Sequence, residues 1–177
     1  MPIYPTPRLL TVLALSVLVA LGVGIFAPGL WAWAPLMAAL LFVAALLDGM
    51  FAPVAAGLTF TIKPPAVLGV GRTVDVPFEA RFTKWRQPAM IELRFGLHRL
   101  LLTPTYERRL ARQDGAFHGT LNLKAMARGR GDIEAAYIRW QGLLGLVYVQ
   151  TRVPLDSETV VTPDLQGVEQ DAADLFS

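Results

Sequence analysis

The feature that most constrains this chain is a long uncharged stretch near its start. No Asp, Glu, Lys, Arg or His occurs between residues 9 and 47. An Ala-Pro-Gly sequence at 27–29 divides the stretch into two apolar runs, 9–26 and 30–47, each 18 residues long. At about 1.5 Å per helical residue, each run spans roughly 27 Å, close to the hydrocarbon thickness of a bilayer. The sequence therefore predicts a transmembrane helical hairpin with a short external loop at 27–29.

Residues that flank the two runs predict how the hairpin is oriented. Arg8 ends the short segment 1–8, and positive charge before a first span favours retention on the cytoplasmic side. Trp31 and Trp33 follow the break, and indole side chains favour the headgroup region. We therefore expect Arg8, Trp31 and Trp33 to be membrane-interface anchors, with both chain ends in the cytoplasm.

Two alternatives to a hairpin remain open. A cleaved signal peptide would use Arg8 and the first apolar run, but no convincing cleavage site follows and a second apolar run would remain. A soluble protein with an apolar helical core would have to bury the whole uncharged stretch. Length and the lack of charge favour the membrane hairpin over both.

After a linker at 48–57, the sequence pattern changes from uniformly apolar to alternating. Apolar and polar residues alternate with a period of two in segments 74–82, 91–97 and 117–123, which is typical of half-buried strands. Turn signals containing Gly or Pro separate these segments from further strand-like runs at 58–63, 99–103, 133–140, 147–153 and 158–161. Seven or eight short strands within 58–162 predict an all-β antiparallel sandwich that is immunoglobulin-like. Residues 163–177 have an apolar stripe, and we expect them to be either the start of a helix or a linker to a missing domain.

The residue types needed for catalysis are sparse. The chain has no cysteine and two histidines, His98 and His118, each among polar or charged strand neighbours. A solvated strand histidine is the simpler interpretation of both. The run 128–131 is Arg-Gly-Arg-Gly and lacks the lysine and hydroxyl residue that complete a phosphate loop. The sequence therefore predicts a protein that is not an enzyme, with no cofactor and no metal.

A basic cluster in the strand region admits two interpretations. It either solubilises the outer strand faces or lies near the anionic leaflet of the membrane. Nucleic-acid binding is disfavoured because Trp85 and Tyr106 are the only aromatic residues close by. The cluster consists of Arg81, Lys84, Arg86, Arg94, Arg99, Arg108, Arg109 and Arg112.

Several short motifs carry a family resemblance. They are Arg130-Gly131, Arg139-Trp140, Leu144-Gly145-Leu146 and the exit sequence Val160-Val161-Thr162-Pro163. In these motifs and in its layout, the chain resembles a bacterial family known as domain of unknown function fifty-eight. The family usually has proline before Leu-Gly-Leu, whereas this chain has Gly142-Leu143, a departure that predicts a looser turn.

The resemblance implies more than the residues themselves indicate. Family members are bacterial membrane proteins with two membrane helices, a β-rich domain and a von Willebrand factor A-like domain, often encoded beside MoxR-type AAA ATPases. The resemblance thus implies a non-enzymatic, multi-pass inner-membrane protein that presents its sandwich for protein contacts. The implied partners are a MoxR-type ATPase and a von Willebrand A-like protein. The alternative is an exported adhesion or ligand-binding sandwich, anchored by the same helices with its β-domain outside.

Overall fold

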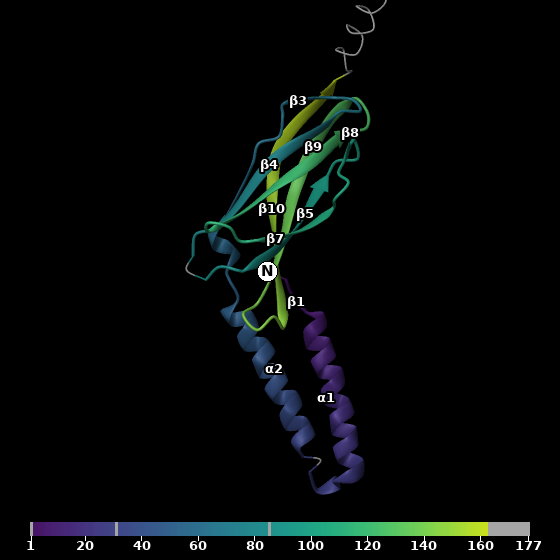
Figure 1. Ribbon diagram of the computed structural model, residues 1–177, viewed down its shortest axis with the longest axis vertical. Coiled ribbons are helices and arrows are strands. Elements are labelled where there is room, and N and C mark those ends of the chain that lie inside the picture. Colours follow the sequence, from purple (N-terminus) through teal and green to yellow (C-terminus); the bar gives the residue numbers. More distant parts are fainter. Residues whose placement is uncertain (1, 31, 85, 163–177) are drawn as a thin grey trace, which may run out of the picture.

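The computed structural model describes residues 2–30, 32–84 and 86–162, with only the backbone at positions 156 and 158. Trp31 and the predicted helix start at 163–177 lie outside the described residues. Among these residues a short strand comes first, two long helices follow, and nine further strands make up most of the rest (Figure 1). The elements are β1 (Ile3–Pro5), α1 (Pro7–Phe26), η1 (Pro28–Leu30), α2 (Trp33–Phe51), η2 (Ala55–Gly57), β2 (Leu58–Ile62), β3 (Val67–Gly69), β4 (Thr73–Phe82), β5 (Met90–Leu97), β6 (Leu101–Leu102), β7 (Glu107–Ala111), β8 (Ala116–Ala125), β9 (Gly129–Gln141) and β10 (Val147–Thr162).

Local sequence explains where α1 begins and ends. The Thr6 hydroxyl accepts a hydrogen bond from the Leu9 N–H, and Pro7 occupies the first helical position, where no N–H is needed. Pro28 lacks the N–H that a continuing helix would use, and α1 ends at Phe26 just before it. The break predicted at 27–29 is therefore confirmed as the turn of a helical hairpin.

Both helices are apolar on all sides: an 18-residue window within residues 7–26 has a mean hydropathy of 2.7, and one within residues 28–57 has a mean hydropathy of 2.2. Each is long and apolar enough to cross a membrane, by length and composition. No described residue of α1 is buried, and Asp48 is the buried residue of α2. The second helix extends to Phe51, so the start of the predicted 48–57 linker is helical instead.

The strands form two sheets. The larger has the order β1-β10-β9-β5-β7, with β3 also beside β10, and the smaller has the order β2-β4-β8-β6. Pairing is antiparallel, as expected, except between β3 and β10, which run parallel. The sequence interpretation missed β1, β3 and β7. It also divided β10 in two, whereas a bulge between Pro154 and Ser157 lets one strand continue through the proline.

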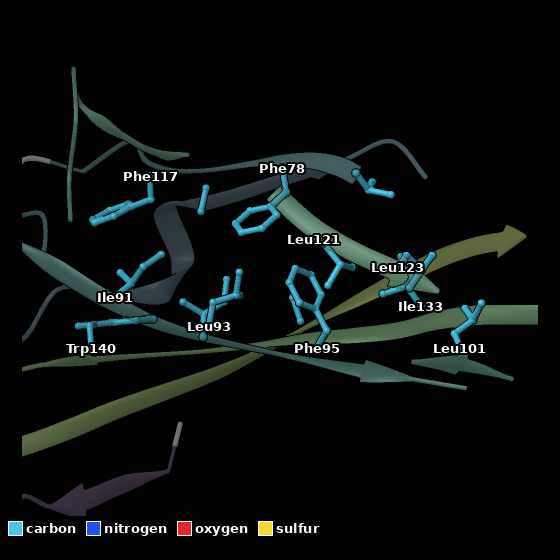
Figure 2. Close-up of a cluster of buried hydrophobic side chains, with 14 of the residues drawn as sticks. Phe78, Ile91, Leu93, Phe95, Leu101, Phe117, Leu121, Leu123, Ile133 and Trp140 are labelled. Atoms are coloured by element: carbon cyan, nitrogen blue, oxygen red, sulfur yellow. The ribbon is translucent and has the colours of Figure 1, made fainter. Parts of the chain in front are cut away.

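The core lies between the two sheets (Figure 2). Phe78, Leu121 and Leu123 point inward from the smaller sheet, and Ile91 and Trp140 face them from the larger one. Apart from Trp140, these are apolar members of the alternating segments, so the period-two pattern predicts the buried faces of those segments correctly. The helices contribute almost nothing to this core.

Candidate functional site: the joint between helices and sheets

The two helices meet the larger sheet at one turn, residues 142–146, which connects β9 to β10. Figure 1 shows this turn lying between the sheet-facing ends of α1 and α2. We call the turn, together with Thr6, Asp48, Pro53 and Trp140, the helix–sheet joint. Thr6 and Asp48 bond to the turn itself, and Trp140 bonds to Pro53 beside it.

Asp48 is the centre of the joint. Its side chain is 1% exposed, although it follows directly after an uncharged helical stretch. One carboxylate oxygen accepts from the Leu144 N–H at 2.6 Å, and the other accepts from Leu146 at 2.7 Å and Val147 at 3.1 Å. Hydrogen bonds to an ionised acceptor are roughly twice as strong as neutral ones. Three such bonds therefore satisfy a buried carboxylate and fix the turn at the end of α2.

Gly142 makes this arrangement possible. A β-carbon at Gly142 would lie 2.5 Å from Cγ and Oδ1 of Asp48, far inside contact distance. Gly145 has φ of +69°, which a residue with a side chain rarely adopts. The Gly142 N–H donates to Val147 O at 2.9 Å. The looser turn expected from the missing proline is therefore wrong: glycine lets the Asp48 carboxylate close on the turn and hold it.

Thr6 attaches the other helix to the same turn. Its N–H donates to Leu146 O at 3.0 Å, and its hydroxyl donates to Gly145 O at 2.8 Å. The segment before it, β1, pairs antiparallel with β10, with Tyr4 opposite Tyr148. The residues ahead of α1 are thus built into the edge of the larger sheet.

A third connection follows α2. The Trp140 indole N–H donates to Pro53 O at 2.9 Å, and both groups are buried. The Trp140 ring packs edge-on against Phe82 with ring centroids 5.1 Å apart, so it also bridges the two sheets. Together, the Thr6, Asp48 and Trp140 contacts fix both helices to β9 and β10.

Arg8 and Trp33, two of the predicted interface anchors, lie at opposite ends of the hairpin. Arg8 is exposed in the first turn of α1, and its guanidinium reaches the Gly145 side of the joint. Trp33 begins α2 at the far end and is exposed.

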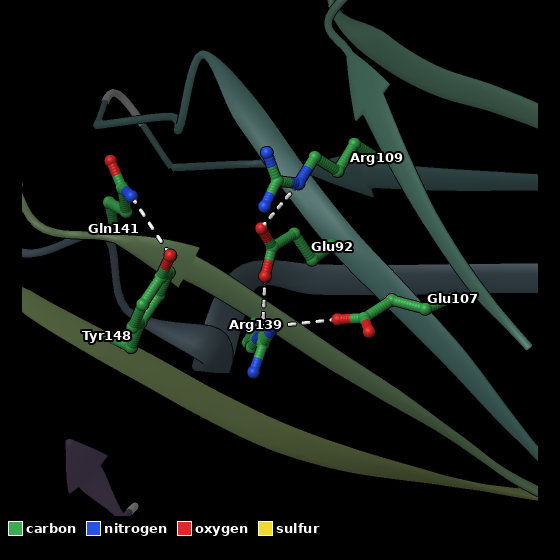
Figure 3. A network of polar contacts seen from close by, with 6 residues as sticks. All are labelled: Glu92, Glu107, Arg109, Arg139, Gln141 and Tyr148. Atoms are coloured by element: carbon green, nitrogen blue, oxygen red, sulfur yellow. Dashed lines mark hydrogen bonds and ion pairs between the residues drawn. The ribbon is translucent and has the colours of Figure 1, made fainter. Parts of the chain in front are cut away.

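A charged network covers the outer face of the larger sheet (Figure 3). Glu92 pairs with Arg109, at 2.9 Å, and with Arg139, which also reaches Glu107 at 2.6 Å. The Arg139 guanidinium lies 5.2 Å from the centre of the Tyr148 ring. Burial alone would lower the pKa of Arg139, but the hydrogen bond and negative charge of Glu92 raise that pKa above its ordinary value. Arg139 therefore remains a cation at every physiological pH.

A groove of about 650 Å³ runs along this outer face beside the network. Tyr137 lies over Gly96 on its floor, and the exposed Tyr106 and the His98 side chain line its rim. His118 projects from β8 in the other sheet, so the two histidines do not meet. Within 2–30, 32–84 and 86–162, no three His, Cys, Asp or Glu side chains gather closely enough to hold a metal ion.

The structure separates the family-motif positions into two places. Leu144, Gly145 and Leu146 form the joint, whereas Arg130 and Gly131 begin β9 at its opposite end. Gly131 gives room to Leu101, whose side chain would lie 3.0 Å from an added β-carbon. Pro163 lies outside the described residues. Asp48 and Thr6 were missed as partners of the Leu-Gly-Leu motif, although the position of Asp48 as the first charge after the apolar run was a usable signal.

The basic cluster also divides. Arg81 pairs with Glu79 on the smaller sheet, and Arg108 donates to Asn122 between the sheets. Arg94 and Arg99 line the outer groove of the larger sheet. Arg86, Arg109 and Arg112 lie near the ends of the long helices, where they line smaller grooves, and Lys84 lies beside Gly57 at the end of η2. One interpretation for the whole cluster is therefore too coarse.

No family model matches the chain, and no curated protein does either. Among solved structures, the chain is similar to native alpha-2-macroglobulin of E. coli, with 14% identity and a TM-score of 0.40 over 60% of this chain but 7% of that one. The CARDB domain of a Pyrococcus furiosus protein matches with 14% identity and a TM-score of 0.36, over 59% of this chain and 87% of the other. The bacterial hydrophobin BslA matches with 14% identity and a TM-score of 0.34, over 59% and 98%. No function follows from similarities of this size.

Proposed function

We propose that this chain is a non-enzymatic membrane protein whose helical hairpin holds an immunoglobulin-like β-sandwich at the surface of a bilayer for contacts with other proteins. The observation that carries this proposal is the unburied apolar surface of α1 and α2. The apolar windows of both helices are 0% buried within the chain. Water would oppose exposing so much hydrocarbon, whereas lipid accommodates it.

The joint supports retention of α1 rather than its removal as a signal peptide. Cleavage after α1 would remove β1 from the sheet edge and would leave the Leu146 and Gly145 carbonyls without Thr6. A helical core of a soluble protein is also disfavoured, because such helices would be buried by the chain itself. A hairpin in lipid is the arrangement consistent with both observations.

The proposed placement is the bacterial inner membrane, with both chain ends and the sheets on the cytoplasmic side. Thr6 and Asp48 bond to the same turn, so the chain enters and leaves the hairpin at one surface. Arg8 lies at that surface, as the positive-inside tendency favours. By the family resemblance, we propose a MoxR-type ATPase and a von Willebrand A-like protein as partners, in envelope-related assembly or chaperone work.

Cysteine labelling tests the placement directly, because the chain has no cysteine of its own. Gly29→Cys lies in the hairpin turn, where an added β-carbon meets nothing within 4 Å, and Arg128→Cys is exposed beside the start of β9. An impermeant thiol reagent on intact cells should label position 29 but not position 128. Labelling at 128 alone would contradict the cytoplasmic placement and favour the exported alternative.

Two further measurements test membrane insertion and the proposed partner separately. The chain should remain in the membrane pellet after alkaline carbonate extraction, and release into the supernatant would contradict insertion. On co-expression, a MoxR-type ATPase from the same organism should copurify with the detergent-solubilised chain. Failure of this second result alone would overturn the partner and leave the anchor intact.

A further inference from the structure

Two small grooves flank the turn of the joint on the underside of the larger sheet. Their volumes are about 490 and 390 Å³. The strip 88–89 and the turn residues Gly142 and Leu143 line both grooves, so the turn stands between them. We call this surface, with its two grooves and the turn tip, the base surface.

The base surface is strongly positive. Five arginines line its grooves, and Glu92 is the acidic residue among the lining side chains. Glu92 is already paired with two of those arginines. The arginines are Arg8, Arg86, Arg109, Arg112 and Arg139.

Two of these arginines have no carboxylate partner among the described residues, so their charge can attract an anion. Arg112 donates to the neutral side-chain oxygen of Gln87 at 3.1 Å, and Arg8 is exposed at the start of α1. Neither forms an ion pair with a carboxylate in the part of the chain that the structure describes. A guanidinium has five N–H donors in a geometry that suits phosphate oxygens. Both side chains can therefore bind a phosphate without giving up an existing ion pair.

The base surface lies at the level of the sheet-facing ends of the two helices. Arg8 lies in the first turn of α1, and the Arg86 guanidinium lies 4.8 Å above the ring of Phe51, the last residue of α2. Leu143, at the tip of the turn, is 82% exposed, and Leu144 beside it is 56% exposed. Arginines and exposed leucines thus meet at the level where the apolar helices begin and end.

We propose that the base surface binds the head groups of anionic phospholipids in the membrane that holds the hairpin. Phosphates lie against Arg8 and Arg112, and the Leu143 and Leu144 side chains enter the boundary between head groups and acyl chains. Charge complementarity and the continuity of the leucines with the apolar helices identify lipid as the occupant. The inference rests on the proposed insertion of the hairpin. Each basic residue near an anionic surface strengthens binding by about fivefold.

Quenching by brominated lipids tests this inference on the full chain. The chain is reconstituted with a fluorophore on Leu143→Cys in vesicles of phosphatidylcholine and phosphatidylglycerol, with bromine on one lipid or the other. Brominated phosphatidylglycerol should quench the fluorophore more strongly than brominated phosphatidylcholine does. The binding constant of phosphatidylglycerol relative to phosphatidylcholine, obtained from this ratio, should therefore exceed one. Arg8→Gln or Arg112→Gln should lower that constant by about fivefold each. The matched control Arg128→Gln removes one charge at the opposite end of β9 and should leave it unchanged.

A second label separates this inference from the proposed function. A fluorophore on Leu21→Cys, in the apolar second half of α1, reports insertion of the hairpin alone. Quenching at 21 but not at 143 would overturn the base-surface inference and leave the hairpin standing. Equal quenching by both brominated lipids at 143, or an equal loss in Arg128→Gln, would also overturn it. The absence of quenching at both positions would contradict the proposed function itself.

Discussion

The helices and the sheets are both rich in apolar residues, but the apolar side chains of the helices are exposed and those of the sheets are buried. Leu18 on α1 is 64% exposed, whereas Leu123 on β8 is 0% exposed. In the sheets every second residue faces a partner sheet, so the chain covers its own hydrocarbon. In the helices apolar side chains cover the whole circumference, and the residues that the structure describes leave them unburied. The comparison shows that pattern, rather than apolar content, tells which solvent each region requires.

The sharpest test of this difference uses the same substitution in each region. Leu123→Ala should lower the free energy of unfolding of the sheets by roughly 2–5 kcal/mol, because it leaves a cavity in a closed core. Leu18→Ala removes the same atoms from an open helix face and should change that free energy by less than about 0.5 kcal/mol. Denaturant unfolding of both variants in one detergent measures the difference. Equal effects would contradict the assignment of separate environments.

The joint between the regions should be vulnerable at Asp48. Asp48→Ala leaves three backbone N–H groups without their acceptor, at a cost of about 1–3 kcal/mol for a buried unsatisfied group. We expect hydrogen exchange to accelerate at Leu144, Leu146 and Val147, with amides in the centre of β9 unaffected. Asp48→Asn keeps the volume but replaces one acceptor with a donor, so it should accelerate exchange at fewer of these amides. Unchanged exchange at these amides in Asp48→Ala would contradict the claim that the Asp48 carboxylate holds the turn.

Adding a methyl group at one of two glycines, Gly142 or Gly49, tests how closely the same joint is packed. Gly142→Ala would force a β-carbon against the Asp48 carboxyl group and should destabilise the joint by about 1–3 kcal/mol. Gly49→Ala lies next to Asp48, but its β-carbon would make only ordinary contacts at 3.7 and 3.9 Å. Thermal unfolding should therefore show a lower Tm for Gly142→Ala and little change for Gly49→Ala. The reverse order would mean that the turn is not closed against α2.

The outer-face network should show the smallest effects. Glu92→Gln removes a carboxylate whose side chain is 11% exposed and which pairs with two arginines, so we expect a loss approaching 1 kcal/mol. Glu107→Gln removes one that is 52% exposed and should cost less than about 0.5 kcal/mol. Unfolding at low and high salt measures both, and the Glu92 effect should shrink with salt. A larger loss for Glu107→Gln would contradict the ranking.

The periodicity of apolar residues predicted the helical hairpin and the buried strand faces well, because this pattern depends only on which residues face water and which face hydrocarbon. It gave the hairpin with its break at Pro28 and the buried faces around Phe78, Ile91 and Leu123. It missed β1 and β3, since each is three residues long and too short to show alternation. It also divided β10 at Pro154, because local sequence does not show that a bulge will carry the strand through.

The joint could not be predicted in the same way because its parts are far apart in the chain. Asp48 and Leu144 are separated by 96 residues, and Thr6 and Gly145 by 139. The local sequence around Gly142 predicts only a looser turn, since nothing in it indicates that the Asp48 carboxylate occupies the space where a side chain at position 142 would lie. Contacts of this kind follow from the pairing of β9 with β10, which only the folded chain defines.

The most direct test of the central claim is labelling from within the bilayer. A lipid-soluble carbene reagent, activated by light in vesicles that contain the full chain, should modify residues on all sides of α1 and α2. Leu10, Leu18 and Leu40 should react, and the buried Ile91 and Leu123 should not. Modification confined to the sheets, with both helices unlabelled, would contradict the account that lipid covers the hairpin.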